Sequence, residues 1–443
     1  MATMKRRDFL GTAGAGLLLG AAAGAKAGNK ADATTPADTI NLAVIGVGSQ
    51  GRNLIDAAAP IPKILFRAVC DIWPYRQQYA VNRLKSYDQS AQAYTDYREM
   101  LDKEKNLDAI LIATPDFTHA EQIKTCLGAG LHVYCETMMA HSIEAGRSVV
   151  RAAKQTSRLV QVGYQRRSHP CYRHVVDKLL GKAELPDQVT QVQTRWVIGA
   201  SEAKGWPRRH TLPEDLLRRF GYDNMHEFRN WPWFREFGAG LAAGLMAHQL
   251  DVVNWFLAAL PNSALAAGGV DFYKSRETPD NLTAVYQYPT AWGTVRACGQ
   301  VLTSTRADGI GHFEQFCGIE GTIRISENPK WTAIFQDPNS VEWDEWVREG
   351  YLVKTRTEPV KPPTSGEQVV RETCQVEPYA LPSLLTKPPL QLHLENFFYA
   401  IRGKADLHCP AEAAFRSEVP ILKAIEAVET RRAIDLSPED FAT

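Results

Sequence analysis

The sequence lacks three features that would point to particular classes of protein. Its 50 Lys and Arg residues are balanced by 50 Asp and Glu residues, so no excess positive charge is present to attract nucleic acid. Its eight cysteines contain no CxxC pair, which favours scattered thiols over a zinc site or a dense disulfide framework. It also shows no internal repeat. With 443 residues, 44% of them hydrophobic, the chain is expected to form two globular domains without a metal or a nucleic-acid partner.

Apolar runs long enough to span a membrane are also missing. The longest near the N-terminus, residues 11–24, is short and rich in Gly and Ala. It follows a twin-arginine signature, KRRDFL at residues 5–10, and precedes AKA, a small-x-small cleavage pattern. We therefore predict a twin-arginine signal peptide over residues 1–27 and a flexible linker over residues 28–39, with a simple N-terminal anchor as the alternative. The protein is then expected to meet the twin-arginine translocation machinery, to be exported to the periplasm or another extracytoplasmic space, and to have no stable membrane span.

Residues 40–165 alternate short apolar runs with helical stretches, which is the pattern of a parallel sheet covered on both faces. The expected helices include residues 120–129 and 143–156. The expected strands are residues 40–47, 66–71, 107–114, 131–136 and 159–164. This part is predicted to be a doubly wound α/β domain of the Rossmann type.

After residue 165 the pattern changes to a helix followed by strand-like runs. The further helices are expected at residues 245–259, 393–402 and 411–432, and the strands at residues 283–288, 294–302, 313–318 and 322–325. These elements predict an α+β domain over residues 166–390 with a mostly antiparallel sheet and helices on one side. Many prolines and charged residues favour irregular structure between residues 326 and 390. Residues 391–443 are expected to be a separate helical part.

A glycine-rich loop, GVGSQG, follows the first expected strand and precedes a helix. In a dinucleotide-binding loop the first glycine permits a tight turn, the second lets the pyrophosphate approach the backbone, and the third lets the helix pack on the strand. Asp71 ends the second strand, where a carboxylate binds the adenosine ribose and repels a 2′-phosphate. Arg76 lies close enough to weaken that repulsion. The pattern predicts a site for NAD, with NADP disfavoured, formed by Gly46, Gly48, Ser49, Gln50, Gly51 and Asp71.

Ligands of parallel sheets bind beyond the carboxyl ends of the strands. Three groups of polar residues directly follow apolar strands, so we expect them at one end of the sheet. An ordinary strand-to-helix turn is the alternative for each group, with Thr114 and Asp116 as helix caps. The candidates for cofactor binding are Thr114, Pro115, His119, Glu136 and Gln165, and the candidates for substrate binding are Tyr164 and Arg166.

Several of these segments resemble the Gfo/Idh/MocA family of sugar and polyol oxidoreductases. The resemblance implies a Rossmann domain, a larger α/β domain whose large open mixed sheet often mediates homo-oligomer contacts, and C-terminal helices that return to the first domain. It also implies that substrate binds between the nicotinamide and one face of that sheet. The matching pieces are AVIGVGSQGR (43–52), AVCD (68–71), ATPDFTHA (113–120), AGLHVYCE (129–136), VGYQRR (162–167), HQLDVVNWFL (248–257), EGTIRIS (320–326) and HLENFFYAIRG (393–403).

The sequence departs from the family at two places that matter for proton transfer. The family has a Lys where this chain has Thr137, and it usually has a carboxylate where this chain has Gly244. Oxidation of a carbinol requires a base for the hydroxyl proton, and a threonine hydroxyl is not a base near neutral pH. The resemblance makes His248 the candidate base, with an ordinary pKa of about 6.5. Asp251 lies on the same helical face and is the candidate that orients the imidazole, with a local cap or ion pair as its alternative. Thr137 completes the candidate catalytic set.

Aromatic and basic residues crowd the segment from residue 196 to residue 237. Flat aromatic rings bind the C–H faces of sugars, and charged groups bind the hydroxyls, so the segment fits a carbohydrate or sugar-acid pocket. Trp206 is the candidate stacking residue. Arg195 and Arg208 are candidates for holding a carboxylate with paired hydrogen bonds. The alternative is a loop packed down by its own aromatics, or an oligomer contact.

Three functions are compatible with these features. The first is an exported oxidoreductase that passes a hydride from a sugar, polyol or related carbohydrate to a tightly bound NAD. The second is a glycoside-cleaving enzyme that recycles NAD through transient oxidation and elimination. The third is a non-catalytic protein that binds a dinucleotide and a sugar, which the missing Lys allows.

Overall fold

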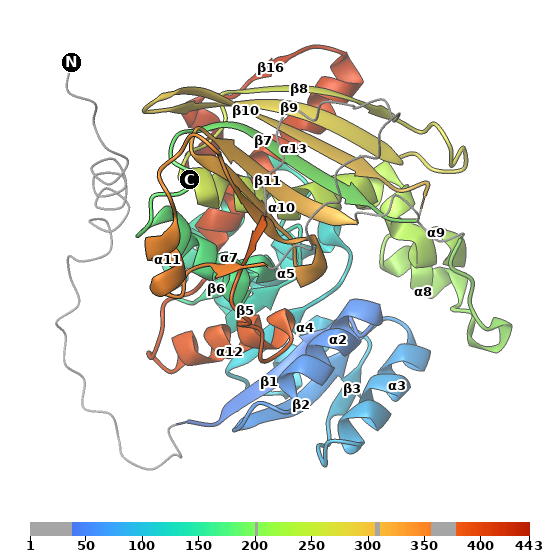
Figure 1. Cartoon of the computed structure of the whole chain (residues 1–443). Helices are drawn as coiled ribbons and strands as arrows, with labels where there is room; N and C mark the ends of the chain where they lie inside the picture. The colour runs from blue at the N-terminus through green and yellow to red at the C-terminus, as the bar shows by residue number, and fades with distance from the viewer. Residues whose placement is uncertain (1–37, 200–202, 306–310, 356–377) are drawn as a thin grey trace, which may run out of the picture.

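The computed structural model describes residues 38–199, 203–305, 311–355 and 378–443 (Figure 1). The expected signal peptide and all but the last two residues of the expected linker lie outside the described residues. Within the described ranges, no helix has the length and apolar character needed to cross a membrane. The described residues form two sheets, one with six strands and one with ten.

The first sheet is parallel throughout and has the order β3-β2-β1-β4-β5-β6, which is the strand order of a Rossmann fold. Its strands are β1 (Ile40–Ile45), β2 (Ile64–Cys70), β3 (Gln92–Tyr94), β4 (Ala109–Ile112), β5 (His132–Cys135) and β6 (Val160–Val162). Its helices are α2 (Ser49–Ala58), α3 (Pro74–Lys85), α4 (Tyr97–Lys103), α5 (Asp116–Gly128) and α6 (Ile143–Thr156). Every residue of the central strand β4 is buried, as expected for a strand covered on both faces. The predicted doubly wound domain is confirmed, with one short strand, β3, that the sequence did not reveal.

The second sheet has the order β14-β15-β13-β12-β11-β7-β10-β9-β8-β16. It is mixed, because β7 pairs in parallel with β10 and antiparallel with β11. Its strands are β7 (Val189–Val197), β8 (Ser263–Gly269), β9 (Asn281–Thr290), β10 (Gly293–Leu302), β11 (His312–Gly318), β12 (Gly321–Ile325), β13 (Ala333–Gln336), β14 (Val353–Lys354), β15 (Pro378–Ala380) and β16 (Ile434–Asp435). The predicted mixed sheet is confirmed. The prediction of irregular structure over residues 326–390 is wrong in part, because β13, β14 and β15 extend the sheet there.

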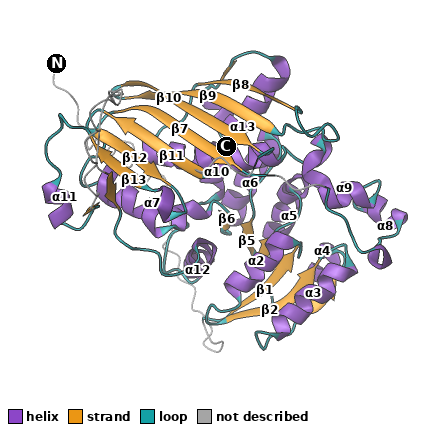
Figure 2. Ribbon diagram, turned by 45° about the vertical axis from the view of Figure 1, so that its right-hand side comes forward, coloured by secondary structure: helices purple, strands orange, loops and turns teal. Residues whose placement is uncertain are grey.

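Helices cover one face of this sheet and connect it to the first domain (Figure 2). Further helices of this part of the chain are α7 (Pro170–His174), α10 (Leu241–Leu257), α11 (Asp344–Arg348), α12 (Pro389–Ile401) and α13 (Ala411–Thr430). Helix α12 packs on α2 and buries Phe397 and Phe398 in the core of the first domain. Helix α13 packs on both α6 and β8. The C-terminal helices therefore contact the first domain, as the resemblance implied.

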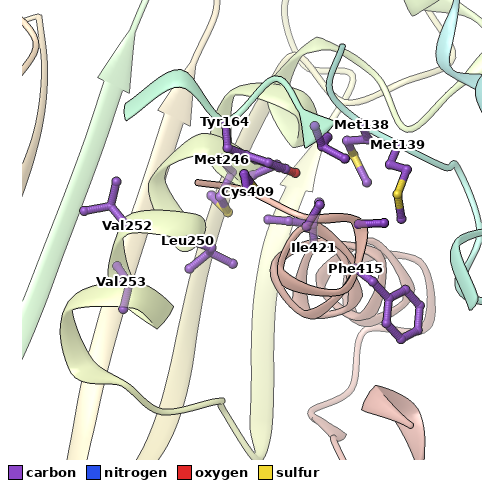
Figure 3. Close-up of a cluster of buried hydrophobic side chains, with 14 of the residues drawn as sticks. Met138, Met139, Tyr164, Met246, Leu250, Val252, Val253, Cys409, Phe415 and Ile421 are labelled. Atoms are coloured by element: carbon purple, nitrogen blue, oxygen red, sulfur yellow. The ribbon is translucent and has the colours of Figure 1, made fainter. Parts of the chain in front are cut away.

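One hydrophobic cluster runs through both domains (Figure 3). In it Met138, which follows β5, lies with Met246 of α10 and Ile421 of α13. This shared core holds α10 against the carboxyl ends of the Rossmann strands. Residues on α10 and residues after β5 are therefore neighbours, although more than a hundred positions separate them.

The aromatic segment contains two short helices, α8 (Glu214–Arg219) and α9 (Met225–Asn230), which project beyond the edge of the ten-stranded sheet (Figure 1). Its apolar side chains form a separate cluster with Trp73, Tyr75 and Phe117 of the first domain. Because Trp73 follows β2 and Phe117 follows β4, the segment packs over the carboxyl ends of those strands. We call residues 203–237 the cap.

Candidate functional site

A cavity of about 770 Å³ lies at the carboxyl ends of the Rossmann strands, between the first domain, α10 and the cap. Residues from the ends of β1, β2, β4, β5 and β6 meet there with one residue of α10. Of the predicted site residues, its walls include Gly46, Gly48, Ser49, Gln50, Asp71, Thr114, Pro115, Glu136, Thr137, Gln165 and His248.

The glycine loop has the three local geometries that the sequence predicted. Gly46 has φ +84°, and a Cβ there would lie 2.6 Å from the Ala113 carbonyl oxygen. A Cβ on Gly51 would collide with the carbonyl oxygen of Gly46. A Cβ on Gly48 would meet no atom within 4 Å, so the backbone at Gly48 opens onto the cavity. Gly46 and Gly51 are therefore needed for packing, and Gly48 leaves room for a ligand.

Helix α2 begins at the cavity with no side chain capping its N-terminus. The first N–H groups of a helix have no partner within the helix, and its dipole favours an anion at that end. The open Gly48 backbone and these uncapped N–H groups together fit a pyrophosphate. The residues present therefore match the dinucleotide that the glycine loop predicts.

Asp71 lies beside this loop, where its carboxylate is held by the backbone. One oxygen accepts the Val47 N–H and the other accepts the Trp73 N–H, each at 2.9 Å. Burial raises the pKa of Asp71, and these two hydrogen bonds oppose that shift. Arg76, next to Asp71 in the cavity wall, places a positive charge on the same side.

The residues after β4 divide between the cavity wall and the core. Thr114 and Pro115 line the cavity, and the Thr114 hydroxyl donates to Gln122 at 2.7 Å. His119 is buried outside the lining, with its ring nitrogens 2.7 Å from the Met138 carbonyl oxygen and 2.8 Å from the Thr114 carbonyl oxygen. Burial lowers the pKa of His119. The structure thus places His119 as a brace between two loops that line the cavity.

Glu136 contributes a buried carboxyl group to the cavity wall. Its Oε1 accepts a hydrogen bond from Gln50 at 2.9 Å, which joins the ends of β1 and β5. Burial raises the pKa of Glu136 to about 7, although the hydrogen bond from Gln50 acts to lower it. Near neutral pH this carboxyl group is therefore partly protonated, and it can donate as well as accept a hydrogen bond.

Thr137 and His248 meet in the wall of the cavity, with 3.1 Å between Thr137 Oγ1 and His248 Nε2. The imidazole is also flanked by the rings of Tyr164 and Trp196, whose centroids lie 5.3 and 6.0 Å away. Burial, with a smaller contribution from the charge of Arg166, lowers the pKa of His248 to about 4. The imidazole is therefore neutral at neutral pH, with its two nitrogens divided between one donor and one acceptor.

The expected contact of Asp251 with His248 is replaced by an ion pair elsewhere. Both oxygens of Asp251 accept from Arg167 Nε, at 2.9 and 3.0 Å, and Arg167 Nη2 adds a third hydrogen bond. Ser417 of α13 also donates to Asp251 at 2.8 Å. Asp251 is fully buried and lies outside the cavity lining, so it braces α10 against the C-terminal helix.

The residues after β6 lie close to His248, and of these Gly163 and Gln165 line the cavity. Tyr164 is buried and donates to Glu418 at 3.1 Å. Arg166 is also buried, with Nη1 2.5 Å from Glu314 and Nε 3.3 Å from Glu327. Burial acts to lower the pKa of Arg166, but the charges of Glu314, Tyr172 and Glu327 together outweigh it, so the pKa is raised. Tyr164 and Arg166 therefore support the wall behind His248 and lie outside the lining that substrate would contact.

The predicted substrate residues of the aromatic segment do not line the cavity. Trp206 donates to Thr211 within the cap, and Arg208 is exposed. Arg195 lies on β7 between Thr194, which contacts Gln249 of α10, and Trp196, which contacts His248. Because side chains alternate along a strand, Arg195 points to the opposite face of the sheet.

Other residues of the cap line the cavity instead. They are Lys204, Arg219, Phe220, Tyr222, Phe228, Arg229 and Trp231. The high aromatic content of the segment was the only signal for them, and no spacing in the sequence separated these residues from Trp206 and Arg208. No group of residues with metal-ligand chemistry is found within the described ranges.

Comparison with known proteins identifies the class to which this fold and site belong. Residues 40–164 match the GFO_IDH_MocA oxidoreductase family, NAD-binding Rossmann fold, and residues 216–436 match the C-terminal alpha/beta domain of the same family. The chain belongs to this family of NAD-binding oxidoreductases.

Three relatives illustrate the range of the similarity. The chain is 28% identical over 173 residues to a 4-carboxy-2-hydroxymuconate-6-semialdehyde dehydrogenase of Sphingobium, covering 39% of this chain and 53% of that one. It is 27% identical over 204 residues to an inositol 2-dehydrogenase of Rubrobacter xylanophilus, covering 45% and 53%. The matches thus span about half the length of these relatives. A crystal structure of an aldose-aldose oxidoreductase from Caulobacter crescentus shares the fold, with a TM-score of 0.65, 15% identity, and coverage of 90% of this chain and 100% of that one.

Proposed function

We propose that the protein is an exported NAD-dependent oxidoreductase that oxidises an alcohol carbon of a sugar, polyol or related carbohydrate. The observation that carries the proposal is the contact between Thr137 and His248 in the wall of the cavity that also contains the glycine loop. The relatives named for inositol and aldose substrates support the carbohydrate class. The cavity wall supports it too, because it combines the hydroxyl group of Thr137, the imidazole of His248 and aromatic rings of the cap.

The Thr137–His248 pair provides a path by which the hydroxyl proton of the substrate is transferred to the imidazole. Bound NAD supplies the acceptor for the hydride that leaves the carbinol carbon. Thr137 Oγ1 accepts the hydroxyl proton as it donates its own proton to His248 Nε2, so the threonine relays a proton without acting as a base. The low pKa of His248 keeps Nε2 available as an acceptor when the ring proton is on Nδ1. In this way the pair replaces the family Lys.

Export and assembly are further parts of the proposal. The twin-arginine signature supports export through the twin-arginine translocation machinery to the periplasm or another extracytoplasmic space. A cap over the cavity supports a tightly held cofactor, which suits a compartment where free NAD is scarce. We place a homo-oligomer contact on the face of the ten-stranded sheet opposite α10, where Gln193 and Arg296 are exposed. Sedimentation of the purified protein tests this contact, and a monomer at micromolar concentration would exclude it.

A carbohydrate panel tests the catalytic part of the proposal. The protein is loaded with NAD⁺ and mixed with polyols, aldoses and aryl glycosides, and both NADH absorbance and aglycone release are followed. The proposal expects NADH to accumulate with at least one free sugar or polyol. Release of aglycone without net NADH would replace it with redox-cycled glycoside cleavage. Saturable carbohydrate binding with neither product would show a binding protein.

A further inference from the structure

Three cations from two parts of the chain meet in the cavity wall beside Asp71. Arg76 comes from α3 of the first domain, and Lys204 and Arg229 come from the cap. Trp73 lies between the two domains at this point. The guanidinium of Arg76 lies 5.4 Å from the centroid of the Trp73 ring, and that of Arg229 lies 5.1 Å from it.

Among the described residues, these cations have little compensating negative charge. The Nε atom of Arg76 is buried and has no hydrogen-bond partner there. Lys204 Nζ forms no ion pair with any described residue, and Arg229 Nε donates only to the Gly205 carbonyl oxygen at 3.3 Å. Two other arginines of the cavity wall differ in this respect, because Arg98 is paired with Glu121 and Arg219 with Asp96.

The electrostatic interactions agree with this geometry. Burial, and then the charge of Arg76, lowers the pKa of Arg229. Partial desolvation and then the charges of Arg229 and Arg76 lower the pKa of Lys204. Asp71 is the nearby carboxylate, but both its oxygens already accept backbone N–H groups. Like charges gathered in a partly desolvated wall are unfavourable unless an anion joins them.

We propose that Arg76, Lys204 and Arg229 form a phosphate-binding subsite through which the cap closes over the dinucleotide. The ligand chemistry is a phosphate group of the cofactor, either its pyrophosphate or the 2′-phosphate of NADP. Lysine and arginine both bind phosphate oxygens, and arginine can donate two parallel hydrogen bonds. The inference rests on the cofactor-binding part of the proposed function and is independent of its carbohydrate chemistry.

The subsite ties the retention of the cofactor to a segment of the second domain. The uncapped start of α2 binds phosphate from the first domain alone, whereas Lys204 and Arg229 approach from the cap. A bound dinucleotide is then enclosed between them, so its release requires the cap to move. Lowering the charge of the cap should speed release without changing the glycine loop.

Affinity measurements on nucleotide-free protein test the subsite. The variants are Lys204→Gln and Arg229→Gln, alone and together, and the ligands are NAD⁺ and NADP⁺, titrated by calorimetry at two salt concentrations. Arg218→Gln is the matched control, because Arg218 lies on α8 of the cap, pairs with exposed Glu214 and does not line the cavity. A charge-assisted hydrogen bond to phosphate corresponds to roughly tenfold in affinity, so each cavity variant should lose about that factor and the control almost nothing.

The two possible phosphate groups predict different patterns of affinity loss for NAD⁺ and NADP⁺. Equal losses for NAD⁺ and NADP⁺ assign the subsite to the pyrophosphate, and a loss confined to NADP⁺ assigns it to the 2′-phosphate. Unchanged affinity of the double variant for both dinucleotides would overturn the proposal. Melting temperatures and the conservative variant Arg229→Lys control for loss of cap packing on Trp73. A protein that binds NAD⁺ through these residues but oxidises no carbohydrate would refute only the proposed reaction.

Discussion

The side chains of Thr137 and His248 meet at 3.1 Å, although 111 positions separate them in the sequence. Their contact depends on the hydrophobic core that holds α10 against the end of β5. It places a hydroxyl group where the family has an ammonium group, directly against the imidazole that remains. The proton chemistry of the site therefore has to be explained by this pair.

Removal of the imidazole should separate catalysis from cofactor binding. His248→Asn is expected to lower turnover by about 10² to 10⁴-fold, the usual contribution of a general acid–base group. Its affinity for NAD⁺ should stay within about twofold, because the glycine loop and Asp71 are untouched. Steady-state rates and calorimetry measure the two quantities. A variant that keeps its turnover would remove His248 from the proton path.

The titration of His248 should lie well below that of an ordinary histidine. Burial lowers its pKa to about 4, so the ring should remain neutral from pH 7 down to about pH 5. Because the unfolded chain binds this proton near pH 6.5, the group lowers the stability of the fold as pH falls from about 6.5 towards 4. NMR of labelled histidine rings measures the midpoint, and His248→Asn identifies the signal. A midpoint between 6 and 7 would contradict the buried environment.

Asp251 should act on stability rather than on chemistry. Asp251→Asn leaves Arg167 without its buried partner, so the free energy of unfolding should fall by about 3 kcal/mol. Turnover measured well below the melting temperature should change little. Glu214→Gln, which breaks the exposed pair with Arg218, is the control and should cost less than about 0.5 kcal/mol. A large loss of turnover in a still-folded Asp251→Asn protein would restore the orienting role predicted from the sequence.

Two glycines of the same loop should respond differently to alanine. Gly48→Ala meets no protein atom, so the fold should keep its stability while NAD⁺ affinity drops by at least tenfold, since the added methyl occupies the space for the pyrophosphate. Gly51→Ala collides with the Gly46 carbonyl and should destabilise the domain itself. Thermal denaturation with and without NAD⁺ distinguishes the two. Normal affinity in Gly48→Ala would place the pyrophosphate elsewhere.

Features set by local geometry could be predicted from the sequence. The glycine loop, Asp71 and the strand ends depend on short-range turns and continuous apolar strands, and they meet where the sheet topology requires. Thr137 and His248 could be named only because a family resemblance placed both in one site. The spacing and composition of the sequence around these two residues do not predict that their side chains are in contact.

Features that depend on long-range packing could not be predicted. Asp251 shares a helical face with His248, but Arg167 and Ser417, which lie on other elements, donate hydrogen bonds to its carboxylate oxygens. Arg195 has the right chemistry for an anionic substrate, yet the pleat of β7 turns it away from the cavity. In the cap, Lys204 and Arg229 line the cavity and Arg208 does not. This difference depends on how the segment folds onto Trp73.

The rate of hydride transfer in Thr137 variants tests the proton relay most directly. The rate is measured with saturating NAD⁺ and a carbohydrate that the wild-type protein oxidises. Thr137→Ser keeps the hydroxyl, and Thr137→Val keeps the shape without it. The proton relay predicts that the Ser variant stays within about fivefold of the wild-type rate and that the Val variant falls by about 100-fold or more, with cofactor affinity unchanged in both. Equal rates in the Val and Ser variants would contradict the relay and leave Thr137 with a structural role only.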